Sequence, residues 1–235
     1  MDIKGFIEAS FVDWNGKICS VLFLSGCNFR CPFCHNVNLV LEPEKLDAIP
    51  LEYLKEKLKE QKEWIDGICI TGGEPTINID LVKLCSTLKN MGFLIKLDTN
   101  GTNPEILKEL VDQKLVNYVA MDIKAPLNEK KYSEATGVRI EKNLNKINQS
   151  IELLKKSNID YEFRTTVVPT LHTEDDIKKI CLKLKGCKRF FLQKFDVSLG
   201  KTTIDPKYSS LTMVEEEMEK FLESARKIIP TTKRR

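Results

Sequence analysis

The chain has 235 residues, of which 42% are hydrophobic and 30% charged, and its formal net charge is +3. This balance fits one large domain, and no apolar run approaches the ~20 residues that a membrane-spanning helix needs. The N-terminus lacks the basic and apolar regions of a signal peptide, and the basic C-terminal tail is too short to indicate nucleic-acid binding. We therefore expect a cytoplasmic protein with no membrane or nucleic-acid partner.

Six short apolar runs follow one another along the chain. They are residues 21–24, 67–70, 93–97, 118–121, 161–168 and 190–192. Most are nearly continuous rather than alternating, which is typical of parallel strands covered on both faces. Apolar side chains also recur at helical steps of three and four, as between residues 51 and 65, 140 and 154, and 214 and 225.

The repeated strand–helix pattern predicts an α/β fold. Six units are too few for a complete eight-fold barrel, so we expect a partial (β/α)6 barrel of the TIM type. No Gly/Ser-rich linker divides the chain, which favours a single domain over residues 1–235. Within it we expect a lead-in strand or lid over residues 1–17, the barrel over 18–228 and a frayed basic tail over 229–235.

Three cysteines, Cys27, Cys31 and Cys34, occur with C-x3-C-x2-C spacing directly after the first apolar run. Three thiolates can hold three irons of a [4Fe–4S] cluster, whereas an electron-transfer cluster uses four cysteines. The fourth iron would then be open to another ligand. A structural zinc site is the alternative, but zinc loops usually pair C-x2-C with a second Cys or His pair, and the sequence has none at a suitable distance.

The other five cysteines indicate no further cluster. Cys19, Cys69 and Cys85 lie in apolar patterns, and Cys181 and Cys187 flank the end of an expected helix. None of them forms a second C-x2-C group. We therefore expect free cysteines and no added ferredoxin-like domain.

Polar groups follow three more of the apolar runs. They are Gly72-Gly73-Glu74, Asp98-Thr99-Asn100 and Asp122-Ile123-Lys124. Loops at the C-terminal ends of barrel strands build one active-site face, so we expect these groups and the three cysteines around one mouth. Taken singly, each group is explained as a turn or a solvated strand end. Together with the cysteines they indicate a site.

The chemistry of these groups suits a small zwitterionic ligand. The Gly72-Gly73 pair allows backbone carbonyls to approach an ammonium group, and Glu74 adds a carboxylate. Thr99 and Asn100 offer a hydroxyl and an amide to a ribose or a carboxylate. Arg164, in the fifth run, either binds a ligand carboxylate or forms an ion pair inside the protein.

These residues resemble the signature of the radical S-adenosylmethionine (SAM) superfamily. Its motif is C-x3-C-x2-C with an aromatic residue, here Phe33, before the last cysteine, followed by Gly-Gly-Glu after the second strand. Within the superfamily, the chain is similar to activases of glycyl radical enzymes through Cys34-His35-Asn36, the lead-in at residues 10–16 and the motifs at 98–101 and 121–124. The subgroup it resembles most activates anaerobic ribonucleoside-triphosphate reductase.

The resemblance implies roles for the matching residues. Cys27, Cys31 and Cys34 would ligate the cluster, and SAM would bind its open iron. Gly72, Gly73 and Glu74 would hold the methionyl amine, with Phe33 and His35 near the adenine. In one activase type, the positions of Asp98, Thr99, Met121 and Asp122 organise a monovalent cation beside SAM. We add Asn100 and Arg164 to the expected cofactor-binding residues because their amide and guanidinium groups can bind a ribose or a carboxylate. Asp122 and Lys124 would face the substrate as catalytic residues.

The resemblance also implies a reaction and partners. Flavodoxin or ferredoxin would reduce the cluster, and SAM would split into methionine and a 5′-deoxyadenosyl radical. The radical would take a hydrogen atom from a glycine Cα of a glycyl radical enzyme, with anaerobic ribonucleotide reductase as the expected partner. Two alternatives remain: a radical SAM enzyme of modified-nucleobase or cofactor synthesis, and an electron carrier or structural metal protein.

Overall fold

The computed structural model describes residues 2–141, 143–197 and 202–235. These residues form one eight-stranded sheet whose strands lie side by side in chain order. The strands are β1 Ile3–Ser10, β2 Cys19–Leu24, β3 Gly67–Gly72, β4 Leu94–Thr99, β5 Tyr118–Asp122, β6 Asp160–Val167, β7 Phe190–Lys194 and β8 Lys233–Arg234. β1 is antiparallel to β2, and every later pair of neighbours is parallel.

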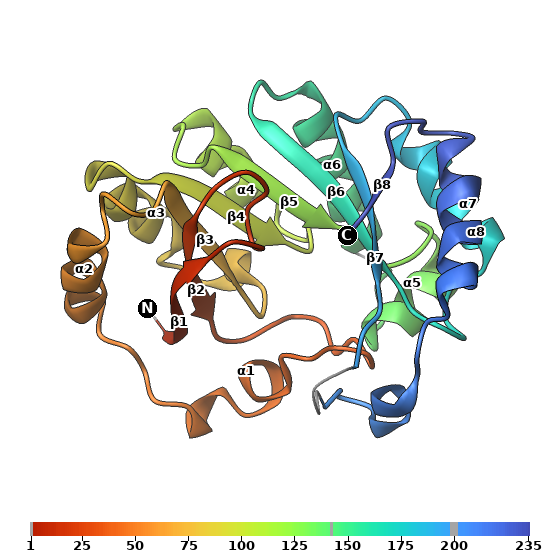
Figure 1. The fold of residues 1–235 in the computed structure, drawn as a ribbon, viewed down its shortest axis with the longest axis horizontal. Helices are drawn as coiled ribbons and strands as arrows, with labels where there is room; N and C mark the ends of the chain where they lie inside the picture. The colour runs from red at the N-terminus through yellow and green to blue at the C-terminus, as the bar shows by residue number, and fades with distance from the viewer. Residues whose placement is uncertain (1, 142, 198–201) are drawn as a thin grey trace.

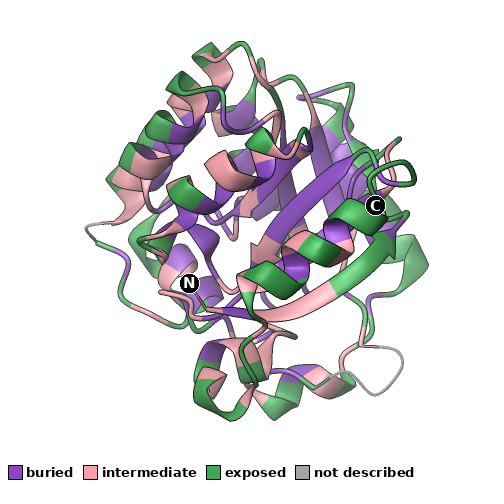
Figure 2. Ribbon diagram, turned by 90° about the vertical axis from the view of Figure 1, so that its left-hand side faces the viewer, coloured by how far each residue is buried: buried purple, intermediate pink, exposed green. Residues whose placement is uncertain are grey.

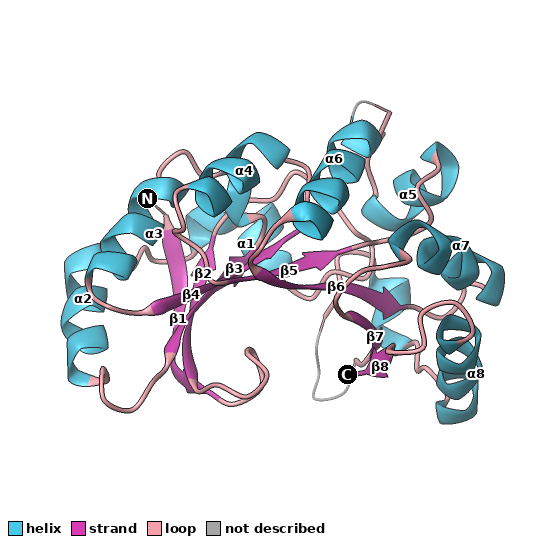
Figure 3. Cartoon of the chain, turned by 90° about the horizontal axis from the view of Figure 1, so that it is seen from above, coloured by secondary structure: helices cyan, strands magenta, loops and turns pink. Residues whose placement is uncertain are grey.

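Helices connect the parallel strands, and the sheet curves into an arch with helices along its convex side (Figures 1 and 3). The α-helices are α1 Val37–Leu41, α2 Leu51–Glu60, α3 Leu81–Asn90, α4 Pro104–Asp112, α5 Glu129–Thr136, α6 Asn143–Lys156, α7 Glu174–Leu184 and α8 Glu215–Arg226. Short 3-10 helices are η1 Pro43–Lys45, η2 Pro75–Ile77 and η4 Pro206–Ser210.

The predicted partial (β/α)6 barrel is confirmed in these residues. All six apolar runs lie in or directly beside strands β2 to β7, and β1 extends the sheet at its start. Two helices are shorter than the apolar pattern suggested, because α2 ends at Glu60 and α6 begins at Asn143. Ile65 and Ile140 are nevertheless buried, so the pattern marked core residues just outside the helices.

The prediction of a frayed basic tail over residues 229–235 is wrong. Lys233 and Arg234 form β8, which pairs with β7 opposite Phe191 and Leu192. Arg235 continues this pairing: its N–H donates to the Leu192 carbonyl at 3.0 Å, and its own carbonyl accepts from the Lys194 N–H at 3.2 Å. The tail therefore supplies backbone partners to β7, which would otherwise be an unpaired edge strand.

The two faces of the sheet differ in chemistry, because side chains alternate along each strand. The main apolar core lies between the strands and the inner sides of the helices, and Figure 2 shows burial concentrated there. The concave face carries polar side chains. Asp98 on β4 and Arg164 on β6 line the pocket there, and Lys96 and Glu162, two positions earlier on the same strands, lie on the same face. In the described ranges, no helix has the length and apolar character to cross a membrane.

Candidate active site

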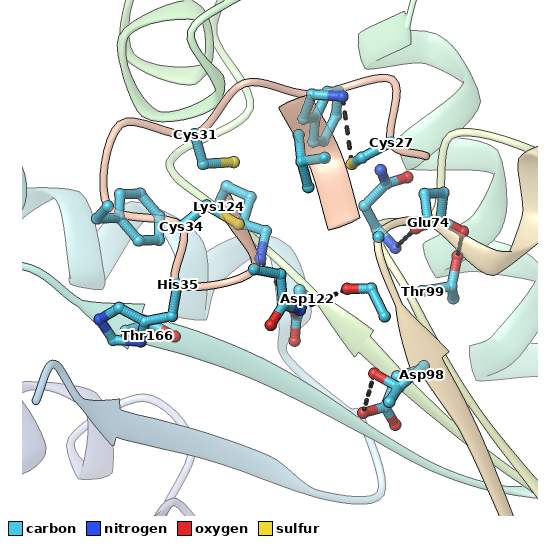
Figure 4. A pocket seen from close by; sticks show the side chains of 18 of the residues that line it. Cys27, Cys31, Cys34, His35, Glu74, Asp98, Thr99, Asp122, Lys124 and Thr166 are labelled. Atoms are coloured by element: carbon cyan, nitrogen blue, oxygen red, sulfur yellow. Dashed lines mark hydrogen bonds and ion pairs between the residues drawn. The ribbon is translucent and has the colours of Figure 1, made fainter. Parts of the chain in front are cut away.

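The segment that follows β2 brings the three predicted cysteines to the C-terminal edge of the sheet. Cys31 is buried, Cys27 and Cys34 are partly buried, and all three are free thiols. A turn in which the Cys34 N–H donates to the Cys31 carbonyl at 2.9 Å orders the segment, and the Phe29 N–H donates to the Cys27 sulfur at 3.3 Å. The three side chains line one pocket (Figure 4).

Distant parts of the chain hold this cysteine segment in place. The Arg30 N–H donates to the Thr136 carbonyl at the end of α5 at 2.8 Å. The N–H groups of Ile204 and Asp205 donate to the carbonyls of Cys34 and Pro32 at 3.2 and 2.9 Å. The cysteine segment is thus clamped by backbone hydrogen bonds from both the α5 end and the loop before η4.

Gly72 and Gly73 allow the loop after β3 to lie against the cysteine segment. A Cβ on Gly73 would come within 1.8 Å of the Gly26 carbonyl oxygen, and one on Gly72 within 2.3 Å of the Leu24 oxygen. Gly72 also has a φ of 118°, which side chains rarely allow. The two glycines therefore allow two loops of the protein to pack closely, whereas the sequence suggested that they allow a ligand to approach the backbone.

Glu74 joins the loops after β3 and β4. Its carboxylate is buried and accepts from the Thr76 N–H at 3.1 Å and the Thr99 hydroxyl at 2.7 Å, and from the Asn100 N–H at 2.5 Å. The Thr76 hydroxyl donates to it as well. Burial raises the pKa of Glu74, and these hydrogen bonds oppose that rise. The sequence suggested that the Thr99 hydroxyl binds a ligand, but in the structure it donates a hydrogen bond to Glu74.

A chain of alternating charges crosses the floor of the pocket. Arg164 Nη1 lies 3.2 Å from Asp98 Oδ2, and Arg164 Nε lies 2.8 Å from Asp122 Oδ1. Buried Lys96 pairs with Asp98 at one end, and Lys124 Nζ lies 2.9 Å from Asp122 Oδ2 at the other. Burial alone would raise the pKa of Asp122, but Arg164 and Lys124 outweigh it and hold that pKa low.

This charge chain decides between the two interpretations of Arg164. Its guanidinium pairs with carboxylates of the protein, as the ion-pair alternative expected. Met121, predicted together with the two aspartates beside a cation, does not line the pocket; its side chain packs beside Gly101.

An aromatic residue that sequence reasoning missed packs against the two side chains that flank Cys34. Phe195, just after β7, stacks on the His35 ring with centroids 5.4 Å apart and meets Phe33 edge-on at 6.3 Å. Thr166 and Gln193 also line this side of the pocket. No local motif marks these three residues; only their positions at the ends of β6 and β7 could have suggested them.

All predicted site residues except Met121 line the same pocket of about 480 Å³. This volume lies within the range of cofactor sites, about 300–1,000 Å³. Among the residues that the structure describes, no three His, Cys, Asp or Glu side chains converge on one metal-ion position. The three thiols lie on one side of the pocket, and each of them can bind a different iron of a cluster.

Burial disfavours the thiolate form of all three cysteines. Burial raises the pKa of Cys27 to about 11 and that of Cys31 to about 12, and it raises the pKa of Cys34 as well. Lys124 is a cation that opposes this rise at all three. Metal binding must therefore displace protons from these cysteines.

Sequence comparison places these features in a known family. Residues 21–184 match the radical SAM superfamily. The chain belongs to the radical SAM superfamily. Its members use a [4Fe–4S] cluster and SAM, and the free thiols and the size of the pocket fit both groups.

Two relatives of this radical SAM enzyme share nearly its whole length. A Methanocaldococcus jannaschii protein, provisionally assigned as a glycyl-radical enzyme activating enzyme, is 36% identical over 97% of this chain and 92% of its own length. The pyruvate formate-lyase-activating enzyme of Clostridium pasteurianum is 27% identical over 94% of each chain. Within the superfamily, this chain therefore groups with the activating enzymes of glycyl radical enzymes.

A solved structure supports the fold alone. Streptococcus suis SuiB bound to S-adenosylmethionine superposes with a TM-score of 0.68 at 16% identity, covering 92% of this radical SAM enzyme and 51% of SuiB. The shared part is thus a single radical SAM fold unit.

Proposed function

We propose that this radical SAM enzyme activates a glycyl radical enzyme, with anaerobic ribonucleotide reductase as the partner. The similarity over nearly the full length of the M. jannaschii relative carries the activase part of the proposal, and the resemblance of the sequence motifs to one activase subgroup supports the choice of partner. The convergence of the cysteine segment, Gly72-Gly73-Glu74 and Asp122-Ile123-Lys124 on one pocket supports it.

Each part of the pocket has a proposed role. Cys27, Cys31 and Cys34 hold the cluster, and the Gly72-Gly73-Glu74 loop receives the amino group of SAM. His35 and Phe33, braced by Phe195, offer aromatic surface to the adenine. When bound, the cluster and SAM supply one-electron cleavage chemistry, whose stable products are methionine and 5′-deoxyadenosine. Asp122 and Lys124 face the entering glycine segment and orient it for loss of a Cα hydrogen atom.

Asp98, Thr99, Asn100 and Arg164 have supporting roles in this proposal. Asn100 Nδ2 donates to Asn28 Oδ1 at 2.8 Å, which ties the loop after β4 to the cysteine segment. Arg164 keeps Asp98 and Asp122 charged and fixed. These residues shape the SAM site through the loops that they join.

The donor and compartment follow from the same chemistry. A small one-electron carrier, flavodoxin or ferredoxin, is the proposed reductant. All eight cysteines are free thiols, which suits a reducing compartment, and we propose the cytoplasm.

The first experiment measures 5′-deoxyadenosine after anaerobic cluster reconstitution, with dithionite and SAM added. We expect product from the native chain and none from Cys31→Ala. No product from a fully loaded native cluster would contradict SAM cleavage and favour a metal carrier.

The second experiment adds purified anaerobic ribonucleotide reductase and records the EPR spectrum. A glycyl radical that disappears when the radical-bearing glycine is replaced by alanine supports the proposed partner. SAM cleavage without a radical on this enzyme would reject that partner, and cleavage without a radical on any glycyl radical enzyme would favour a small-molecule substrate.

A further inference from the structure

A tight turn after β6 carries a buried histidine that the proposed chemistry does not use. Thr170 in this turn has a φ of 68°, a left-handed conformation that is unusual for a β-branched residue. The turn closes with the His172 N–H donating to the Val168 carbonyl at 3.2 Å. It thereby directs the imidazole of His172 into the protein, where only 6% of the residue is exposed.

Both ring nitrogens of His172 have backbone partners. Nδ1 accepts a hydrogen bond from the Val168 N–H at 3.1 Å. Nε2 lies 2.8 Å from the Lys124 carbonyl oxygen, which can only accept, so Nε2 carries the hydrogen. The ring is therefore neutral and held in one tautomer, and it links the loop after β6 to the loop after β5.

The loop after β5 is held at several backbone atoms. The Thr165 hydroxyl donates to the Ile123 carbonyl at 2.9 Å, and the Lys124 N–H lies 3.3 Å from the Tyr132 hydroxyl. With His172 on the Lys124 carbonyl, both backbone polar groups of Lys124 are engaged. These bonds determine where the Lys124 side chain begins and hence where its ammonium group can lie.

The ammonium group of Lys124 enters the pocket beside the cysteines. Figure 4 shows Lys124 on the same side of the pocket as Cys31 and Cys34, across from Glu74 and Thr99. Asp122, its ion-pair partner, is shared with Arg164, so the charge of Lys124 is not fully neutralised by that carboxylate. A fixed positive charge beside a cluster raises the cluster's reduction potential, because reduction adds negative charge.

We propose that His172 is a positioning residue: its hydrogen bond to the Lys124 carbonyl keeps the Lys124 ammonium beside the cluster, where it favours the reduced state. The inference rests on the proposed cluster ligation by Cys27, Cys31 and Cys34, but not on the glycyl partner. His172 touches neither cluster nor substrate and acts through Lys124.

The test separates the two hydrogen bonds of the imidazole. The oxygen of asparagine occupies the place of Nδ1, so His172→Asn keeps the acceptor for Val168 and loses the donor to Lys124. The amide nitrogen of glutamine reaches the place of Nε2, so His172→Gln keeps that donor. The readout is the midpoint potential of the reconstituted cluster, titrated by EPR without SAM or partner, which does not depend on glycyl-radical formation.

We expect Lys124→Met to shift the midpoint potential to more negative values, because the positive charge is removed. His172→Asn should shift it in the same direction, and His172→Gln should remain close to the native value. Thr170→Gly, which relieves the left-handed turn without changing either ring nitrogen, should leave the potential unchanged. Iron content and thermal unfolding establish that each variant is folded and loaded.

Three results would overturn the proposal. One is an unshifted potential in Lys124→Met, and another is equal potentials for the asparagine and glutamine variants. The third is a shift in Thr170→Gly as large as that of His172→Asn, which would assign the effect to the turn. His172→Gln provides a fallback if His172→Asn does not load a cluster. In that case, a midpoint potential of His172→Gln equal to that of Lys124→Met would also contradict the proposal.

Discussion

Arg235 and Glu162 form an ion pair on the concave side of the sheet, although 73 positions separate them in the sequence. Arg235 Nη1 lies 2.6 Å from Glu162 Oε1, and Nη2 lies 3.3 Å from Oε2. The guanidinium also lies 4.4 Å from the centroid of the Phe191 ring, and the Tyr118 hydroxyl donates to Glu162 at 2.6 Å. The end of the chain thus neutralises a carboxylate that is 1% exposed.

Replacing Arg235 with alanine should destabilise the fold much more than the same change at Arg234. Arg235→Ala removes the ion-pair partner of the buried Glu162 carboxylate, a loss of about 3 kcal/mol in the free energy of unfolding. Arg234 pairs with the exposed Glu215, so Arg234→Ala should cost less than about 1 kcal/mol. Urea unfolding measures both values. Equal losses would show that the Glu162 pair contributes no more than a surface pair.

Gly73→Ala should weaken SAM binding by forcing the loop after β3 away from the cysteine segment. Overpacking of this kind costs about 1–3 kcal/mol, which corresponds to roughly a 5- to 150-fold loss of affinity if it falls on the bound state. Gly16→Ala is the control for strain outside the pocket: its φ of 75° disfavours alanine, but nothing lies within 4 Å of the added Cβ and Gly16 does not line the pocket. Calorimetric titration of the cluster-loaded proteins with SAM makes the comparison. Native affinity in Gly73→Ala would show that the two loops can separate without harm to the site.

Glu74→Gln should lower stability as well as SAM binding. The amide nitrogen would take the place of one carboxylate oxygen, so the site would lose either the hydrogen bonds from the Thr76 N–H and the Thr99 hydroxyl or the hydrogen bond from the Asn100 N–H. Loss of hydrogen bonds to a buried charged group costs about 1.5–3 kcal/mol. Glu52→Gln, on an 80% exposed side chain of α2, serves as the control and should leave the unfolding temperature nearly unchanged. A native-like unfolding temperature for Glu74→Gln would mean that the carboxylate does not join the two loops.

The stability of the native chain should include a pH-dependent contribution from His172. Burial lowers the pKa of His172 below its usual value near 6.5. Above that value both folded and unfolded chains carry a neutral ring, so the contribution is complete. As the pH falls below it, the unfolded chain binds the proton first, and stability decreases until the folded-state pKa is passed.

The free energy of unfolding of the native chain and of His172→Gln is measured between about pH 7 and pH 5. The difference between their pH dependences is the contribution of His172, which is at most about 1.4 kcal/mol per pH unit. The native chain should lose more stability than the variant over this range. Parallel pH dependences would show that the His172 pKa is unchanged by folding.

The sequence alone determined the family chemistry and the order of the strands. The C-x3-C-x2-C spacing and the Gly72-Gly73-Glu74 motif are local patterns, and their chemistry depends mainly on residue type and spacing. The six apolar runs are equally local, since continuous apolar segments are what parallel strands covered on both faces require. The meeting of the polar groups at one pocket followed from these strands, because parallel strands place their C-terminal ends at one edge.

Only the tertiary structure decided how the site residues are used. Glu74 joins two loops through Asn100, Arg164 connects Asp98 and Asp122, and Phe195 stacks on His35. The same holds for the His172 bond to Lys124 and the β8 pairing that replaced the expected frayed tail. Each of these contacts joins residues at least 26 positions apart. Such pairings depend on the register and curvature of the sheet, which a local sequence pattern does not encode.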